Sequence, residues 1–238
     1  LPFPSVLAAL IIKSFPFTSI STMFLSFDCV NDDAVSSKLY KSFKLAFNFT
    51  ALEKLKLVTL FRGEEVRESS QVFTFEEFGI HEALLSNLNK CGFSSMTPIQ
   101  RKVVPLINNG SDIMGCSQTG SGKTISFLSP VIDIMLKRGP LSDKQLKPGV
   151  SAPLCLILVP TRELAEQIYK EARKLCYRTG IIVAKVYGGV GYDPQKMALE
   201  DGCDILVATP GRLIDFLNKQ NIKLNEVRHL VIDEADRI

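Results

Sequence analysis

Cysteines are few in this sequence and stand far apart. Six occur among 238 residues, without a C-x-x-C pair or a Cys/His cluster. This spacing excludes the common zinc-binding patterns and gives no sign of a disulfide framework. Scattered thiols are typical of a reducing compartment, so we predict that these side chains occupy core or neutral positions rather than reactive ones.

Long apolar runs and a strong net charge are lacking as well. The apolar run near the N-terminus spans residues 6–12 and ends at Lys13, whereas a membrane-spanning helix needs about 20 residues. No basic stretch of the kind that opens a signal peptide precedes it, so we expect no membrane association. The formal net charge of +3 permits a nucleic-acid partner but is too small to indicate one.

Glycine is absent from the first 62 residues, and twelve of the fifteen phenylalanines fall before residue 79. This stretch shows neither helical nor strand periodicity, and its many aromatic residues are a poor fit to polar disorder. We therefore predict an atypical Phe-rich extension over residues 1–72, with an unstructured segment as the alternative. A short helical region over 73–101 and an α/β domain over 102–238 are predicted to follow it.

Apolar strands alternate with amphipathic helices in the remaining sequence. We predict strands over 112–116, 154–159, 181–186, 204–208 and 229–232. We predict helices over 81–90, 98–107, 161–174, 194–200 and 212–219, and one more that ends near residue 136. This alternation predicts a doubly wound parallel sheet with helices on both faces. Ligands bind such sheets at the carboxyl ends of the strands.

One stretch, residues 117–124, has the order of a phosphate-binding loop. It follows an apolar strand and leads into a helix, and small residues fill it. A loop of this kind turns its N–H groups toward a phosphate at the positive end of the helix dipole. Lys123 would reach the β- and γ-phosphates, and the Thr124 hydroxyl would bind Mg²⁺. We expect all eight residues to bind ATP: Ser117, Gln118, Thr119, Gly120, Ser121, Gly122, Lys123 and Thr124.

A second motif, the acidic residues 233–236, follows the apolar run that ends at Ile232. A carboxylate at a strand tip beside a phosphate-binding loop is the Walker B arrangement. Asp233 would hold Mg²⁺, partly through water, and Glu234 would orient and deprotonate the attacking water. Together with Lys123, these two carboxylates are the predicted catalytic residues.

Three further segments at strand ends are suited to phosphates of a nucleic-acid backbone. Two are strand-to-helix junctions that offer backbone N–H groups and an arginine, and the third is a Gly-Gly pair. Each alone is a common turn, but together on one sheet edge they predict sequence-independent binding. The residues are Pro160, Thr161, Arg162, Gly188, Gly189, Thr209, Pro210, Gly211 and Arg212.

In this order and spacing, residues 117–124, 160–165, 209–212 and 233–236 resemble motifs I, Ia, Ib and II of the DEAD-box RNA helicases. The residues that flank these motifs are most similar to those of the Vasa and Ded branch. The resemblance implies a RecA-like fold, ATP and Mg²⁺ as cofactors, and RNA as partner. It also implies a cytoplasmic protein, with the nucleus and ribonucleoprotein granules as possible further locations. Protein partners are not indicated.

Residues 92–100 resemble the Q motif of the same family, with Phe75 as its isolated upstream aromatic. The resemblance implies that Gln100 reads the adenine edge and that Phe75 stacks on the base. A carboxamide offers a donor and an acceptor together, which suits adenine N6 and N7. This element argues against another P-loop ATPase, such as a DNA-repair helicase.

The sequence stops two residues after Asp236. The resemblance implies a Ser-Ala-Thr segment and a second RecA-like domain with an arginine finger beyond that point, so we expect a fragment whose sheet is incomplete at the C-terminus. Because an arginine finger contributes about 10³–10⁵ in rate, the fragment alone would hydrolyse ATP very poorly. The alternative is a non-catalytic nucleotide- or RNA-binding module.

Overall fold

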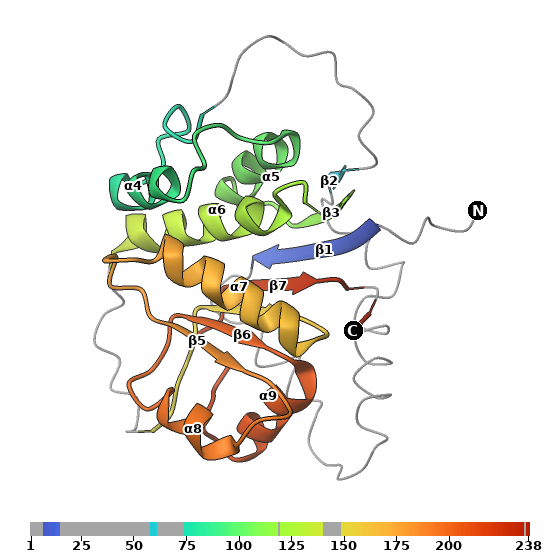
Figure 1. Ribbon diagram of the computed structural model, residues 1–238, viewed down its shortest axis with the longest axis vertical. Coiled ribbons are helices and arrows are strands. Elements are labelled where there is room, and N and C mark those ends of the chain that lie inside the picture. The colour runs from blue at the N-terminus through green and yellow to red at the C-terminus, as the bar shows by residue number, and fades with distance from the viewer. Residues whose placement is uncertain (1–6, 15–57, 61–73, 119, 140–148, 236) are drawn as a thin grey trace, which may run out of the picture.

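The computed structural model (Figure 1) describes residues 7–14, 58–60, 74–118, 120–139, 149–235 and 237–238, with the backbone alone for 7–14, 58–60 and 114–118. Its strands are β1 (Leu7–Ser14), β2 (Val58–Leu60), β3 (Ile113–Gln118), β4 (Cys155–Leu158), β5 (Val183–Val186), β6 (Ile205–Ala208) and β7 (His229–Asp233). Its helices are α4 (Glu82–Lys90), α5 (Pro98–Asn108), α6 (Lys123–Arg138), α7 (Arg162–Leu175), α8 (Tyr192–Met197) and α9 (Pro210–Asn218).

The described strands form one sheet in the order β2-β3-β1-β7-β4-β6-β5. Strands β7, β4, β6 and β5 are parallel to one another, and β2 is parallel to β3. Strand β1 is antiparallel to both β3 and β7, so β3 and β7 themselves run in the same direction. The predicted α/β fold is confirmed, with one antiparallel strand that the sequence did not predict.

Strands β1 and β2 lie inside the stretch predicted as an extension. The apolar run of β1 pairs on both sides within the sheet, and a strand of that kind shows a continuous apolar run instead of alternation. Periodicity therefore gave no strand signal there. Residues 1–6, 15–57 and 61–73 lie outside the described residues, so the predicted domain boundaries stay predictions.

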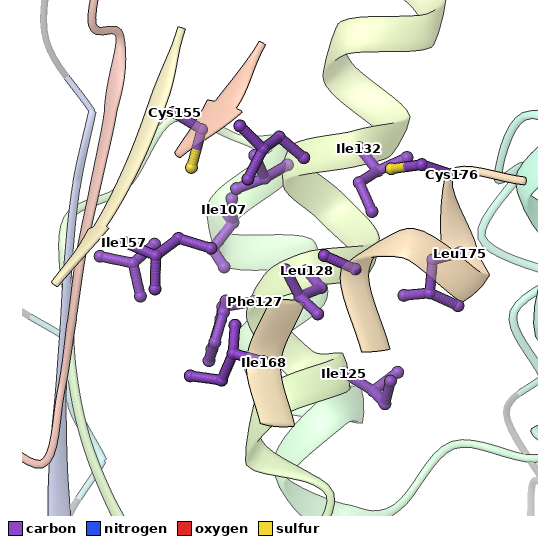
Figure 2. Packing of buried hydrophobic residues seen from close by; sticks show 14 of the residues in the cluster. Ile107, Ile125, Phe127, Leu128, Ile132, Cys155, Ile157, Ile168, Leu175 and Cys176 are labelled. Carbon is purple, nitrogen blue, oxygen red and sulfur yellow. The ribbon is translucent and has the colours of Figure 1, made fainter. Parts of the chain in front are cut away.

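The apolar strands are buried because helices cover both faces of the sheet. Alternate residues of β4 point to opposite faces: Cys155 and Ile157 join a cluster with α4–α7, while Leu156 and Leu158 join one with α9. Figure 2 shows part of the first cluster, where side chains of α6 and α7 meet those of the sheet. In Figure 1, α4–α6 gather at the top of the view and α8 and α9 at the bottom.

Two buried polar side chains fix α4 on the domain. The Asp133 carboxylate on α6 accepts a hydrogen bond from the His81 N–H, at the start of α4, over 2.7 Å. The Asn87 amide donates to the carbonyls of Leu175 (2.9 Å) and Tyr177 (2.8 Å) at the end of α7. These contacts set the position of the helical region that precedes α5.

The predicted helices and strands agree with the observed ones to within a few residues at each end. The largest shift is in α8, predicted over 194–200 and observed over Tyr192–Met197. Pro194 lies in its first turn, where a missing N–H costs little because those N–H groups have no partner within the helix. The prediction began this helix at the proline and so placed it too late.

Candidate functional site

Strands β3 and β7 bring the phosphate-binding loop and Asp233 to one edge of the sheet. Gly115 of β3 and Asp233 of β7 both pair with Leu10 of the intervening β1, so they lie level with each other. Neighbouring strands are about 4.8 Å apart, which separates the β3 and β7 backbones by about 10 Å. Both strands point the same way, so the loop that leaves β3 after Gln118 starts on the edge where Asp233 ends β7.

The loop leads directly into the first turn of α6. Gly122 is the N-cap of this helix and has φ +87°, in the left-handed region that favours glycine. The first hydrogen bond of the helix runs from the Ser126 N–H to the Gly122 carbonyl. The N–H groups of the preceding turn therefore have no partner within the helix, which makes this end a suitable anion site. Lys123, the first helical residue, is buried at 9% exposure.

The other predicted residues of the loop are placed in part. Gly120 and Ser121 lie in the loop, where Gly120 is exposed and Ser121 is half-buried. Thr124 is half-buried in the first turn of α6. Ser117 and Gln118 belong to β3, of which the backbone is described. Thr119 lies outside the described residues. Their predicted contacts with ATP stay predictions.

Gln100 holds the Q-motif helix α5 against this loop. Its Oε1 atom accepts a hydrogen bond from the Thr97 N–H over 2.9 Å, and its Nε2 atom donates to the Gly122 carbonyl over 3.1 Å. The sequence predicted contact with adenine instead. A carboxamide has two N–H groups and two acceptor lone pairs, and these bonds use one of each, so the adenine contact stays a prediction.

Thr97 is part of this contact, and sequence reasoning treated it only as the residue before a helix. A Cβ added to Gly122 would lie 2.9 Å from the Thr97 hydroxyl oxygen and 2.5 Å from Gln100 Nε2. That hydroxyl is buried and has no hydrogen-bond partner among the described residues. The available signal was its place in the stretch resembling the Q motif, three residues before Gln100.

Phe75 is buried in this structure, and its predicted stacking on the base stays a prediction. Phe75 is 1% exposed and belongs to the core cluster under α4 and α6. Another aromatic residue, Phe93, is half-buried in the loop between α4 and α5, four residues before Thr97.

The acidic motif turns sharply after β7. Asp233 is 5% exposed, and its Oδ1 atom accepts a hydrogen bond from the Glu234 N–H over 3.0 Å. Glu234 has φ +50°, a conformation that costs a non-glycine residue about 1–3 kcal/mol and is found mainly at functional sites. Its carboxylate is partly exposed and pairs with Arg237 over 3.3 Å. Asp236 lies outside the described residues.

Arg162 and the Gly-Gly pair, predicted separately, lie together. A Cβ on Gly189 would come 3.8 Å from Arg162 Nη1. The exposed Arg162 guanidinium also lies 5.2 Å from the centre of the Tyr187 ring, within the range of a cation–π contact. Thr161, which follows Pro160, caps α7 by accepting the Leu164 N–H over 3.3 Å. The structure thus joins two of the three predicted backbone-binding segments.

Arg212 connects the third segment to loop 187–191, which contains the Gly-Gly pair, although its side chain is largely buried. Its Nη2 atom donates to the Val190 carbonyl over 2.9 Å, and its side chain is 13% exposed. Its Nη1 atom is buried without a hydrogen-bond partner among the described residues. Thr209, Pro210 and Gly211 form the start of α9 beside it. Arg212 therefore holds loop 187–191 through its hydrogen bond to the Val190 carbonyl.

A polar network under Arg162 was not predicted. The Glu166 carboxylate accepts hydrogen bonds from Lys185 Nζ over 2.5 Å and from the Tyr187 hydroxyl. These bonds from Lys185 and Tyr187 lower the pKa of Glu166, which keeps it charged. The network fixes the Tyr187 ring on which Arg162 lies. Lys185 and Tyr187 come from the end of β5, and no sequence motif marked them.

Other reactive groups are few in the part of the chain that the structure describes. No cluster of three His, Cys, Asp or Glu side chains there could hold a metal by itself. Cys155, Cys176 and Cys203 lie in the core, as predicted, and burial raises the pKa of each thiol. No described helix is both long and apolar enough to cross a membrane.

The sequence of this chain is similar to those of known proteins. The family model for the DEAD/DEAH box helicase matches residues 97–238. The ATP-dependent RNA helicase DDX4 of Mus musculus is 42% identical over 167 residues, which cover 70% of this chain and 24% of that protein. The DEAD-box ATP-dependent RNA helicase 52A of Oryza sativa subsp. japonica is 41% identical over 192 residues, 79% of this chain and 32% of that protein.

Solved structures give the same family. A DEAD box protein from Methanococcus jannaschii matches with a TM-score of 0.53 and 33% identity, over 65% of this chain and 39% of that one. The yeast DEAD-box splicing factor Prp28 matches with a TM-score of 0.55 and 33% identity, over 67% and 39%. The chain spans about a quarter to a third of the length of the curated relatives named above. By its motifs, fold and relatives, the chain belongs to the DEAD/DEAH box helicase family.

Proposed function

We propose that this chain is the ATP-binding part of an ATP-dependent RNA helicase, which couples ATP hydrolysis to local unwinding of an RNA duplex. The observation that carries the proposal is the shared sheet edge: the loop before α6 leaves β3 on the edge where the Asp233 carboxylate ends β7, with β1 between the two strands. The names of the relatives, ATP-dependent RNA helicases, support the same reaction.

The proposed roles follow from charge and position. Lys123 binds the β- and γ-phosphates at the start of α6, where the positive end of the helix dipole adds to its charge. Thr124 and Asp233 hold Mg²⁺, partly through water, and the remaining ligands are water and phosphate oxygens, as is usual for this ion. When bound, Mg²⁺ neutralises charge that develops on the phosphates. Glu234 accepts the proton of the attacking water.

The RNA contacts are proposed for the neighbouring loops. Arg162, Gly188 and Gly189 lie together at the ends of β4 and β5, and Arg212 holds the adjoining Val190 carbonyl. Arginine and backbone N–H groups bind phosphate oxygens without reading bases. We therefore propose an RNA backbone site with little sequence preference and a strong dependence on salt.

Glu234→Gln tests the catalytic proposal. The variant keeps the size of the side chain and removes its ability to accept a proton, so ATP and RNA binding should persist while RNA-stimulated hydrolysis falls by about 10²-fold or more. Phosphate release and equilibrium binding are measured in parallel. Glu200→Gln, an exposed position after α8, makes the same charge change and should leave hydrolysis unaltered.

A second candidate is a non-catalytic module that binds nucleotide and RNA. The ion pair between Glu234 and Arg237 favours it, because a carboxylate that contacts a guanidinium is not free to orient an attacking water. Absence of RNA-stimulated hydrolysis in the full-length protein that contains this chain, with ATP and RNA both bound, would support the module and contradict the helicase. Normal hydrolysis by the Glu234→Gln variant would instead contradict the role given to Glu234.

A further inference from the structure

We propose that Gln195 of α8 is a positioning residue that holds loop 187–191 in the conformation that receives an RNA phosphate backbone. The inference rests on the proposed RNA binding. Gln195 was no part of any motif in the sequence, and it does not reach the exposed edge itself, since it is 9% exposed. It acts through the backbone of the loop.

The Gln195 side chain closes both ends of the loop. Its Oε1 atom accepts the Tyr187 N–H over 2.8 Å, and its Nε2 atom donates to the Tyr187 carbonyl over 3.1 Å. The same Nε2 atom donates to the Gly191 carbonyl over 3.1 Å. One carboxamide thus joins the first and last residues of a five-residue loop. Of the side chains of this length, only glutamine offers an acceptor and two donors together.

The middle of the loop is held from two other sides. Arg212 of α9 donates to the Val190 carbonyl, and Arg162 of α7 lies against Gly189. Three helices, α7, α8 and α9, therefore fix a segment rich in glycine. Glycine-rich backbone loses the most freedom when it is ordered, so a loop without these contacts would have to be ordered by the ligand.

The part of the loop that faces outward is free to bind. Gly188 and Gly189 are both exposed, and within the described chain their N–H groups make no hydrogen bond. Beside them lies the Arg162 guanidinium. N–H groups in a fixed direction next to a cation suit a phosphate oxygen. Because the loop is already ordered, binding loses less conformational entropy.

Gln195→Glu tests this in the full chain. Glutamate has the same size and still accepts the Tyr187 N–H, but it places an oxygen against two carbonyls in place of the amide donor. Gln195→Met, which is uncharged, is the second variant. Gln220→Glu, exposed at the other end of α9, repeats the charge change away from the loop and serves as the control.

Three readouts separate a positioning role from a structural one. Affinity for single-stranded oligouridine of about 12 nucleotides, at about 100 mM salt, should fall about fivefold in both Gln195 variants. ATP affinity should be unchanged, and hydrogen exchange of the Tyr187 N–H should become faster. The Gln220→Glu variant should match the unaltered protein in all three.

The outcomes are distinct. Faster exchange at Tyr187 with unaltered RNA affinity contradicts the inference and leaves the proposed function standing. An equal loss of ATP and RNA affinity in Gln195→Met contradicts it too, because the residue would then support the domain as a whole. If the unaltered protein binds no oligouridine, the proposed RNA binding fails and the inference fails with it.

Discussion

At the scale of single residues, Gly122 is where the Q-motif helix and the phosphate-binding loop meet. Its carbonyl accepts the Gln100 amide, its φ is +87°, and a Cβ there would lie 2.5 Å from Gln100 Nε2. Glycine is therefore required both by the backbone conformation and by the approach of α5. A change at this residue should affect nucleotide binding and stability together.

Gly122→Ala should remove measurable ATP binding and lower the free energy of unfolding by more than the strain of a left-handed alanine, about 1–2 kcal/mol. Gly202→Ala separates the two causes, because Gly202 has φ +80° and a Cβ added there would meet nothing within 4 Å. It should show the strain alone and bind ATP normally. Calorimetric titration measures ATP binding, and chemical denaturation measures the free energy of unfolding. Equal effects of the two substitutions would show that the Gln100 contact does not matter.

Residues of the site were predictable where the chemistry depends on local order, and less so where it depends on packing. The glycines, Lys123 and Asp233 follow strands at a spacing that places them on one edge. Burial of Phe75 depends on how α4 and α6 pack over it, which no local pattern reveals. Thr97 lies against Gly122, the Tyr187 hydroxyl bonds the Glu166 side chain, and Gln195 bonds the backbone of Tyr187. These contacts depend on how the chain packs, which the order of residues alone does not reveal.

At the scale of elements, strand β7 carries a buried ionisable residue at each end. Asp233 at its carboxyl end faces the proposed ATP site, while His229 begins the strand at the other edge and is 5% exposed. Burial, together with the nearby charges of Arg138 and Arg228, lowers the pKa of His229 to about 4. Its Nδ1 atom has no hydrogen-bond partner among the described residues. The imidazole is therefore neutral in the folded chain near neutral pH.

This strand should make stability depend on pH. An unfolded histidine has a pKa near 6.5, so between pH 6.5 and 4 the unfolded chain binds more protons, and the free energy of unfolding falls as pH falls. From pH 7 to pH 5 the loss through His229 should be about 2 kcal/mol. Above pH 6.5 this contribution should not change further.

His229→Gln should remove that part of the dependence. Urea denaturation at pH 7 and pH 5 gives the change in the free energy of unfolding for each protein, and the loss in the unaltered protein should exceed that in the variant. The same loss in both proteins would mean that His229 is protonated in the folded chain or is not buried.

Elements were predictable because most strands are short apolar runs and most helices begin at a cap residue. Thr97 and Thr161 precede α5 and α7, and both helices start where the sequence predicted, to within a residue. Strand β1 was missed because its pairing partners, β3 and β7, are about 100 and 220 residues away in sequence. A periodicity search cannot detect a pairing that is set by such distant neighbours.

At the scale of the whole molecule, the parallel direction of β3 and β7 explains why motifs distant in sequence form one site. Strands that run in the same direction place their carboxyl ends on a common edge, and the sheet carries the loops after β3, β4, β5, β6 and β7 there. The loops after β3 and β7 are proposed to bind ATP, and those after β4, β5 and β6 to bind RNA. One edge would then couple the two ligands.

The most direct test of this account is a double-mutant cycle on binding of ATP with Mg²⁺, using Lys123→Ala, Asp233→Asn and the two combined, with Lys223→Ala as a surface control. If both side chains act on one triphosphate–magnesium pair, each single change should weaken binding about tenfold or more, and the combined change should cost clearly less than the sum of the two. Losses that add without coupling, or single variants that bind like the Lys223→Ala control, would contradict a shared site.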